Sequence, residues 1–122
     1  ATLTGACMVA LGDKIAGLLG NDDALADELL GAADRTGERL WRLPLPADYR
    51  KLLDSPIADV KNIGSRYGGT LTAGLFLQEF VTEGTAWAHL DIAGPAWSEE
   101  VDAEIPKGGT GFGVRTLIDW LS

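Results

Sequence analysis

The chain has 122 residues, a length that favours one domain and allows a sizeable core to be buried. Hydrophobic residues make up 46% of it, and ten Lys plus Arg against eighteen Asp plus Glu give a formal net charge of -8. This acidic balance repels phosphate backbones and argues against nucleic-acid binding. Cys7 is the lone cysteine, which excludes an internal disulfide, and no apolar run is long enough for a membrane span. We therefore expect a soluble, cytoplasmic protein.

The first part of the chain predicts two helices and two extended segments. Residues 1–4 have β-strand character, whereas chain ends are usually loose, so we expect the sequence to begin inside a domain. A short helix over 6–11 is followed by a buried strand over 15–19. The clearest helix comes next, with Asn21 as its N-cap and Gly37 at its end.

The middle of the chain predicts shorter elements. Charged and apolar residues alternate over 38–43, which is typical of a strand, and we expect its apolar members, including Trp41, to pack on opposite faces. A short helix over 47–53 and an extended segment over 57–63 follow. Residues 71–81 are apolar on nearly every side, which predicts a buried helix.

The stretch 87–94, Trp-Ala-His-Leu-Asp-Ile-Ala-Gly, organises our interpretation of the whole chain. We predict a buried central strand that delivers the loop 95–113 to a functional edge of a sheet. Ligands of open α/β sheets bind beyond the carboxyl ends of the strands, so Ala93, Gly94 and Ala96 are the first candidates for a pocket wall. A core strand followed by an ordinary surface loop is the alternative interpretation.

Strands that alternate with helices predict an α/β fold with helices on both faces of the sheet. We expect a three-layer α/β/α sandwich with a mixed, mostly parallel sheet, and the short helices suggest that it is part of a larger domain. The last helix has its apolar residues at the i, i+3, i+4, i+7 spacing of an amphipathic helix. These residues are Val114, Leu117, Ile118 and Leu121.

Few residues suggest catalysis by this chain. His89 is the only histidine, no nucleophile elbow occurs, and Cys7 lies in an apolar helix where a thiol is normally inert. One histidine, one cysteine and scattered carboxylates do not support a zinc site. The acidic run 98–104 is best interpreted as a solvated surface. The glycine-rich segment 107–113 precedes a helix and is either an anion cradle or, more simply, a flexible loop.

Four segments occur in the order and spacing typical of one enzyme family. They are residues 1–6, 58–64, 87–94 and 107–117. Together they make the chain resemble the leucyl (cytosol) aminopeptidases, the M17-type metallo-exopeptidases. The resemblance covers essentially all of residues 1–122, as the C-terminal segment of the catalytic domain. It implies release of N-terminal, Leu-like amino acids from peptides by a cytoplasmic hexamer.

The same resemblance divides the site between this chain and residues upstream of it. Enzymes of the family hold two divalent ions, zinc, manganese or magnesium, with a bridging water, through carboxylates and a lysine that precede the equivalent of Ala1. We therefore expect this segment alone to bind no metal and to lack activity. The resemblance also implies that the backbones of Leu3 and Gly5 bind the peptide, and that Thr2, Gly5, Ala93 and Ala96 line the pocket for its N-terminal side chain.

Two other interpretations belong to different functional classes. The segment could be a non-catalytic assembly module that associates through apolar surface left uncovered outside the complete domain. It could also be an independent small-molecule binder that uses the glycine-rich segment 107–113 to hold a phosphate. A peptidase assay with added manganese and a phosphate titration separate these interpretations from the enzyme.

Overall fold

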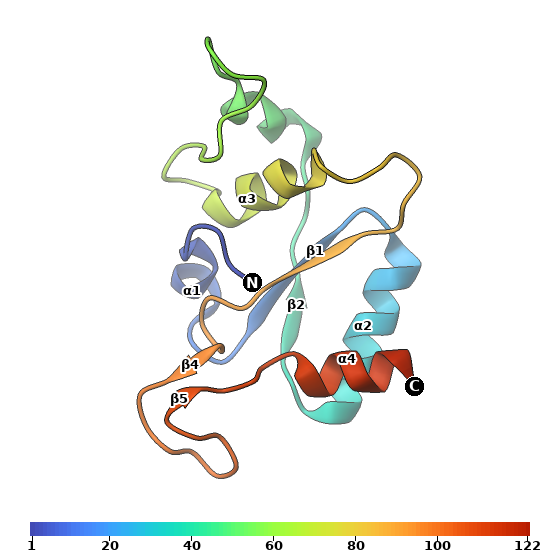
Figure 1. Ribbon diagram of the computed structural model, residues 1–122, viewed down its shortest axis with the longest axis vertical. Coiled ribbons are helices and arrows are strands. Elements are labelled where there is room, and N and C mark those ends of the chain that lie inside the picture. Colours follow the sequence, from blue (N-terminus) through green and yellow to red (C-terminus); the bar gives the residue numbers. More distant parts are fainter.

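The computed structural model describes all 122 residues, from Ala1 to Ser122 (Figure 1). The chain alternates helices and strands, as expected. The elements are α1 (Ala6–Leu11), β1 (Ala16–Gly20), α2 (Asp23–Thr36), β2 (Leu40–Arg42), the 3-10 helix η1 (Ala47–Leu53), α3 (Gly69–Gln78), β3 (Ala88–Asp91), β4 (Trp97–Ser98), β5 (Gly108–Gly109) and α4 (Val114–Leu121).

The main sheet has three strands in the order β2-β1-β3. β1 runs parallel to β2 and antiparallel to β3, so the sheet is mixed as predicted, with one pair of each kind. The predicted central position of residues 87–94 is wrong within this chain, because β1 lies in the centre and β3 lies beside it. β4 and β5 form a separate two-stranded ribbon inside the segment that we had predicted to be a loop.

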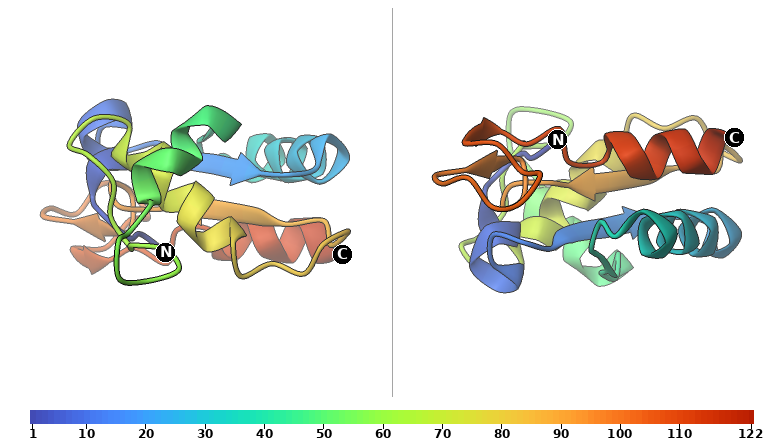
Figure 2. Two further views of the ribbon diagram at one scale, coloured as in Figure 1. Left: turned by 90° about the horizontal axis from the view of Figure 1, so that it is seen from above. Right: turned by 90° about the horizontal axis from the view of Figure 1, so that it is seen from below.

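Helices cover both faces of the sheet, which confirms the α/β fold with three layers. In Figure 1 β1 and β3 run diagonally between α1 and α3 on one side and α2 and α4 on the other, and Figure 2 shows the same layers from above and below. Leu18 of β1 packs against Ala26 and Leu29 of α2. On the opposite face α1 lies close to β1, because a Cβ on Gly17 of β1 would lie only 2.9 Å from the Cys7 Sγ of α1.

The N-cap of α2 is Asp22 rather than Asn21. The Asp22 carboxylate accepts a hydrogen bond from the Leu25 N–H, as expected at a helix start. Asn21 instead connects two loops, because its amide donates to the Thr85 carbonyl and accepts from the Trp87 N–H. Both residues are good caps, so local chemistry alone could not choose between them.

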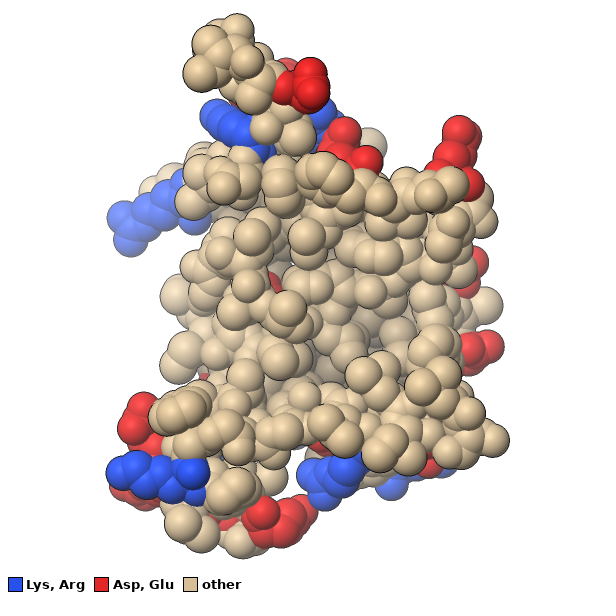
Figure 3. Space-filling model, viewed as in Figure 1, with Lys and Arg blue, Asp and Glu red and all other residues tan.

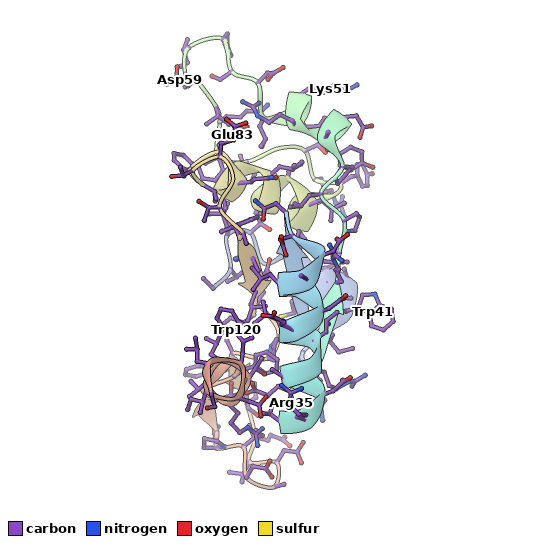
Figure 4. All side chains as sticks on the ribbon, turned by 90° about the vertical axis from the view of Figure 1, so that its right-hand side faces the viewer. Arg35, Trp41, Lys51, Asp59, Glu83 and Trp120 are labelled. Carbon is purple, nitrogen blue, oxygen red and sulfur yellow. The ribbon has the colours of Figure 1, made fainter.

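Four other predictions need correction. Trp41 is 64% exposed and points away from the molecule in Figure 4, because β2 is an edge strand with one exposed face. Residues 57–63 were expected to be extended, but the chain bends at 57–59 and at 62 and pairs with no strand, and residues 1–4 form no strand either. The buried helix ends at Gln78, two residues before the exposed Phe80.

The last helix, α4, has the predicted spacing but the opposite orientation. It packs on α2 through buried Thr116 and half-buried Trp120, whose indole N–H donates to Glu28, and Figure 4 shows Trp120 between the two helices. Its four periodic apolar residues are 41 to 75% exposed. No helix in the structure is long and apolar enough to cross a membrane.

Candidate functional site

The N-terminal segment lies beside the end of β3. The Ala1 amino group donates to the Leu90 carbonyl, and the Ile92 N–H donates to the Ala1 carbonyl, both at 2.9 Å. This pair of bonds to the two neighbours of Asp91 is the pattern of a parallel ladder. Residues separated by about 90 positions in the sequence are therefore fixed side by side.

Gly5 forms the start of α1 in a conformation that few other residues adopt. Its φ is 71°, in the left-handed region, and its carbonyl accepts the Met8 N–H. No other atom lies within 4 Å of the position of a Cβ at Gly5. The Thr2 hydroxyl is 3.4 Å from the Gly5 nitrogen, so the segment folds back on itself and leaves Gly5 facing open space.

A tight turn follows β3 and packs against the loop after α1. The Ala96 N–H donates to the Ile92 carbonyl at 3.1 Å, which closes the turn. Gly94 is buried because a Cβ there would lie 2.1 Å from the Gly12 carbonyl oxygen and 2.9 Å from the Asp13 Cα. The absence of a side chain at Gly94 therefore lets these two backbones meet.

Asp91 connects the segments that meet at this point. It is fully buried, and its Oδ1 accepts the Ala93 N–H at 3.2 Å, while the Cys7 thiol donates to its carbonyl at 3.7 Å. Asp91 Oδ2 and His89 Nε2 are the only buried side-chain nitrogen or oxygen atoms that have no hydrogen-bond partner in the structure. Because His89 and Asp91 are two residues apart in a strand, both lie on the sheet face covered by α1 and α3.

Burial controls the protonation of this cluster. It lowers the pKa of His89, which the Asp91 carboxylate partly offsets, so the imidazole is neutral at neutral pH. Burial, with the nearby Asp91 carboxylate, raises the pKa of the Cys7 thiol. Cys7 is thus a protonated structural thiol, which agrees with the inert role expected from the sequence.

The N-terminus of α4, where the glycine-rich segment ends, already binds an anion from within the chain. Glu38 is buried, and its carboxylate accepts the Gly113 N–H and the Thr116 N–H, both at 2.9 Å, and the Thr116 hydroxyl at 2.6 Å. An external phosphate would have to displace this carboxylate, which occupies the positive end of the helix. The independent phosphate binder is therefore disfavoured.

A cavity of about 1050 Å³ lies on another side of the turn. It is bordered by Gly94 and Pro95 together with the acidic loop after β4, and by Lys14, Arg39 and Arg115. The predicted pocket residues Thr2, Leu3, Gly5, Ala93 and Ala96 do not line it. Its rim carries both charge signs, so it does not resemble a pocket for an aliphatic side chain.

The comparison with family models identifies this chain. Residues 1–118 match the catalytic domain of the cytosol aminopeptidase family. The chain belongs to that family. Curated members of the family include the probable cytosol aminopeptidases of Synechococcus sp. (strain CC9902), 59% identical over 121 residues, and Picosynechococcus sp., 60% identical over 122 residues. Each alignment covers 99% of this chain, which spans only about a quarter of either relative, 25% and 24%.

Solved structures agree with the family assignment. A tomato leucine aminopeptidase mutant has a TM-score of 0.90 and 47% identity, covering 97% of this chain and 22% of its own. The bottromycin maturation enzyme BotP in complex with Mn has a TM-score of 0.94 and 52% identity, covering 99% of this chain and 27% of its own. The cytosol aminopeptidase fold therefore extends over nearly the whole chain.

The donor atoms of this chain do not fit the divalent ions of a cytosol aminopeptidase. No three His, Cys, Asp or Glu side chains are grouped as a metal site requires. Cys7, His89 and Asp91 lie near one another but do not form such a group. The Cys7 thiol is protonated and donates a hydrogen bond, which leaves one imidazole nitrogen and one carboxylate oxygen.

The structure brings the two predicted groups of site residues to the same end of β3. Ala1 is hydrogen-bonded to Leu90 and Ile92, and it is followed in the chain by the first group, Thr2, Leu3 and Gly5. The second group, half-buried Ala93 and Ala96, lies in the turn that comes after Ile92. The sequence already made Gly94 a candidate for the pocket wall, as a small residue after a strand, but it did not predict the close approach of Gly94 to Gly12. The part that Asp91 takes in holding this arrangement was missed. A charged residue inside an apolar run was the available signal for Asp91.

Proposed function

We propose that this chain is part of a metal-dependent aminopeptidase that removes Leu-like N-terminal residues from peptides. Membership of the cytosol aminopeptidase family supports this activity, and the quarter-length coverage of the relatives supports a longer parent protein that contains the chain. Residues of the parent protein outside this chain would hold two divalent ions. The manganese complex of BotP favours manganese over zinc or magnesium. We also propose a cytoplasmic homo-hexamer for the parent protein.

In this proposal the chain supplies the wall of the substrate pocket. The backbones of Leu3 and Gly5 bind the peptide, and Thr2, Gly5, Ala93 and Ala96 surround the N-terminal side chain. The observation that carries the proposal is the pair of hydrogen bonds from Ala1 to β3, which joins these two groups. Small side chains leave space for an aliphatic group, and an open Gly5 allows a peptide backbone to approach closely.

Gly5→Val in the parent protein tests this assignment. The valine side chain would enter the open space beside Gly5, so we expect KM for a Leu-peptide to rise and kcat to fall while bound manganese is unchanged. Gly37→Val is the matched control, because Gly37 also has a left-handed φ, of 74°, and no atom within 4 Å of a Cβ. Equal kinetics for both variants would remove Gly5 from the site.

A second candidate function is non-catalytic assembly. Val114, Ile118 and Leu121 of α4 are each more than half exposed, which is unusual for large apolar residues on one helix. The face of the molecule that carries β3 and α4 is also nearly free of charge at its centre, with Lys, Arg, Asp and Glu around its rim (Figure 3). Self-association of the chain without peptidase activity in the parent protein would favour this candidate.

A further inference from the structure

The side chain of Asp91 is energetically unfavourable in its buried position. It is fully buried, its Oδ2 has no partner, and no cation lies among its hydrogen-bond or ion-pair partners. An unpaired buried carboxylate oxygen is unfavourable, so packing alone does not explain an aspartate here. Its only side-chain hydrogen bond is the one from the Ala93 N–H to Oδ1.

The backbone of Asp91 adds contacts to two further segments. Its carbonyl accepts the Cys7 thiol of α1, and its two neighbours in the chain form the ladder pair with Ala1. On the other edge Asp91 pairs with Gly17 of β1. One residue therefore connects α1, the N-terminal segment, the sheet and the turn that begins at Ala93.

We propose that Asp91 is a positioning residue that fixes the width of the substrate pocket, an inference that rests on the proposed function. Its carboxylate holds the Ala93 N–H and so sets where Ala93 and Ala96 stand relative to the N-terminal segment that passes Asp91 on the other side. Asp91 does not touch the substrate. Its role is to keep two pocket walls at a distance that suits a branched aliphatic side chain.

The test compares Asp91→Leu and Asp91→Asn in the parent protein, assayed with Leu-peptides and Ala-peptides in manganese. Leucine removes the acceptor for the Ala93 N–H, and we expect the preference in kcat/KM for Leu over Ala to fall roughly fivefold or more. Asparagine keeps an acceptor oxygen at the same place, and we expect its preference to stay within about twofold of the parent protein, since one good hydrogen bond suffices.

Thr116→Val is the matched control for loss of stability. Thr116 is as buried as Asp91, but its hydroxyl donates to Glu38, which lies between α2 and β2, and it has no contact with the pocket turn among its hydrogen bonds. This variant should melt at a lower temperature and keep the Leu over Ala preference. An unchanged preference in Asp91→Leu, or an equal loss in Asp91→Leu and Thr116→Val, would overturn the positioning role.

Hydrogen exchange separates this inference from the proposed function. The Ala93 amide should exchange slowly in the parent protein and in Asp91→Asn, and at least tenfold faster in Asp91→Leu, because its acceptor is lost. This readout needs no activity. If the parent protein hydrolyses no peptide, the proposed function fails and the exchange rates still test the link from Asp91 to Ala93. Equal exchange in all three proteins would contradict that link.

Discussion

The region around the central strand β1 and the region around the edge strand β3 differ in how completely they are packed. β1 is covered by α2 on one face and by α1 and α3 on the other, and Ala16, Leu18 and Leu19 are fully buried. On the β3 side the N-terminal segment is largely exposed, and α4 turns its apolar residues outward. The β1 region is a fully packed hydrophobic core. The β3 region has the properties of a surface that another part of a protein covers.

Gly94→Ala should produce the largest loss of stability, because it forces apart two backbones at a close contact between the turn after β3 and the loop after α1. The new Cβ would lie 2.1 Å from the Gly12 carbonyl oxygen, and backbone cannot rotate away as a side chain does. We expect a loss of about 3 kcal/mol or more in the free energy of unfolding, measured with urea. Gly109→Ala, with nothing within 4 Å of its Cβ, is the control and should be nearly neutral. Similar stabilities of the two variants would contradict the close approach.

Leu18→Ala and Ile118→Ala compare the two regions directly. Leu18 is fully buried in the cluster with α2, so its truncation should cost roughly 2–5 kcal/mol. Ile118 is 62% exposed, so its truncation should cost less than about 0.5 kcal/mol in the chain. Urea unfolding of both variants measures the difference. A cost for Ile118→Ala in the parent protein well above that in the chain would show that the α4 surface is covered there.

Glu38→Gln tests how α4 is attached to the rest of the fold. The amide keeps one acceptor oxygen, so its NH2 group would face either the Gly113 N–H or the Thr116 N–H and hydroxyl, which Glu38 now accepts with its two oxygens. We expect a loss of about 1–3 kcal/mol, as for other buried groups left without a partner. Asp22→Ala removes an ordinary helix cap and should cost about 1 kcal/mol. Thermal melting that ranks Asp22→Ala as the more damaging change would contradict the buried role of Glu38.

His89 should make a smaller contribution to the free energy of unfolding, and this contribution should depend on pH. Its pKa is lowered by burial, so the unfolded chain binds a proton before the folded chain does as the pH falls below about 6.5. Its contribution to stability is complete above that pH and declines toward the folded pKa, by at most about 1.4 kcal/mol per pH unit. Urea unfolding at pH 7.5 and 5.5 should show this decline in the chain and a weaker decline in His89→Gln. Equal pH dependence of both proteins would exclude His89 as its source.

The sequence predicted those parts of the fold that depend on local patterns. Alternation of helix and strand, the glycine ends of α1 and α2, and the buried residues of α3 all follow from neighbouring residues. The orientation of α4 did not follow, because an apolar helix face indicates burial without saying which part of the protein buries it. The choice of Asp22 over Asn21 depended on Thr85 and Trp87, which lie more than 60 residues away.

For the candidate site, the list of residues stays a prediction, and the sequence did not predict the contacts that hold their segments together. The resemblance to aminopeptidases implied Thr2, Leu3, Gly5, Ala93 and Ala96, and the structure brings the segments that carry them to one end of β3. The contacts that hold these segments are long-range and depend on backbone geometry. No local pattern reveals that Gly94 meets the Gly12 carbonyl or that Asp91 serves both walls.

The most direct test of the account measures peptidase activity and metal binding together, in the 122-residue chain and in the parent protein. Both are incubated with manganese and a Leu-peptide after removal of contaminating proteases. We predict leucine release and tightly bound manganese for the parent protein, and neither for the chain, because no three His, Cys, Asp or Glu side chains of the chain are grouped as a metal site requires. Leucine release by the purified chain alone, or a parent protein that is inactive with bound manganese, would contradict the account.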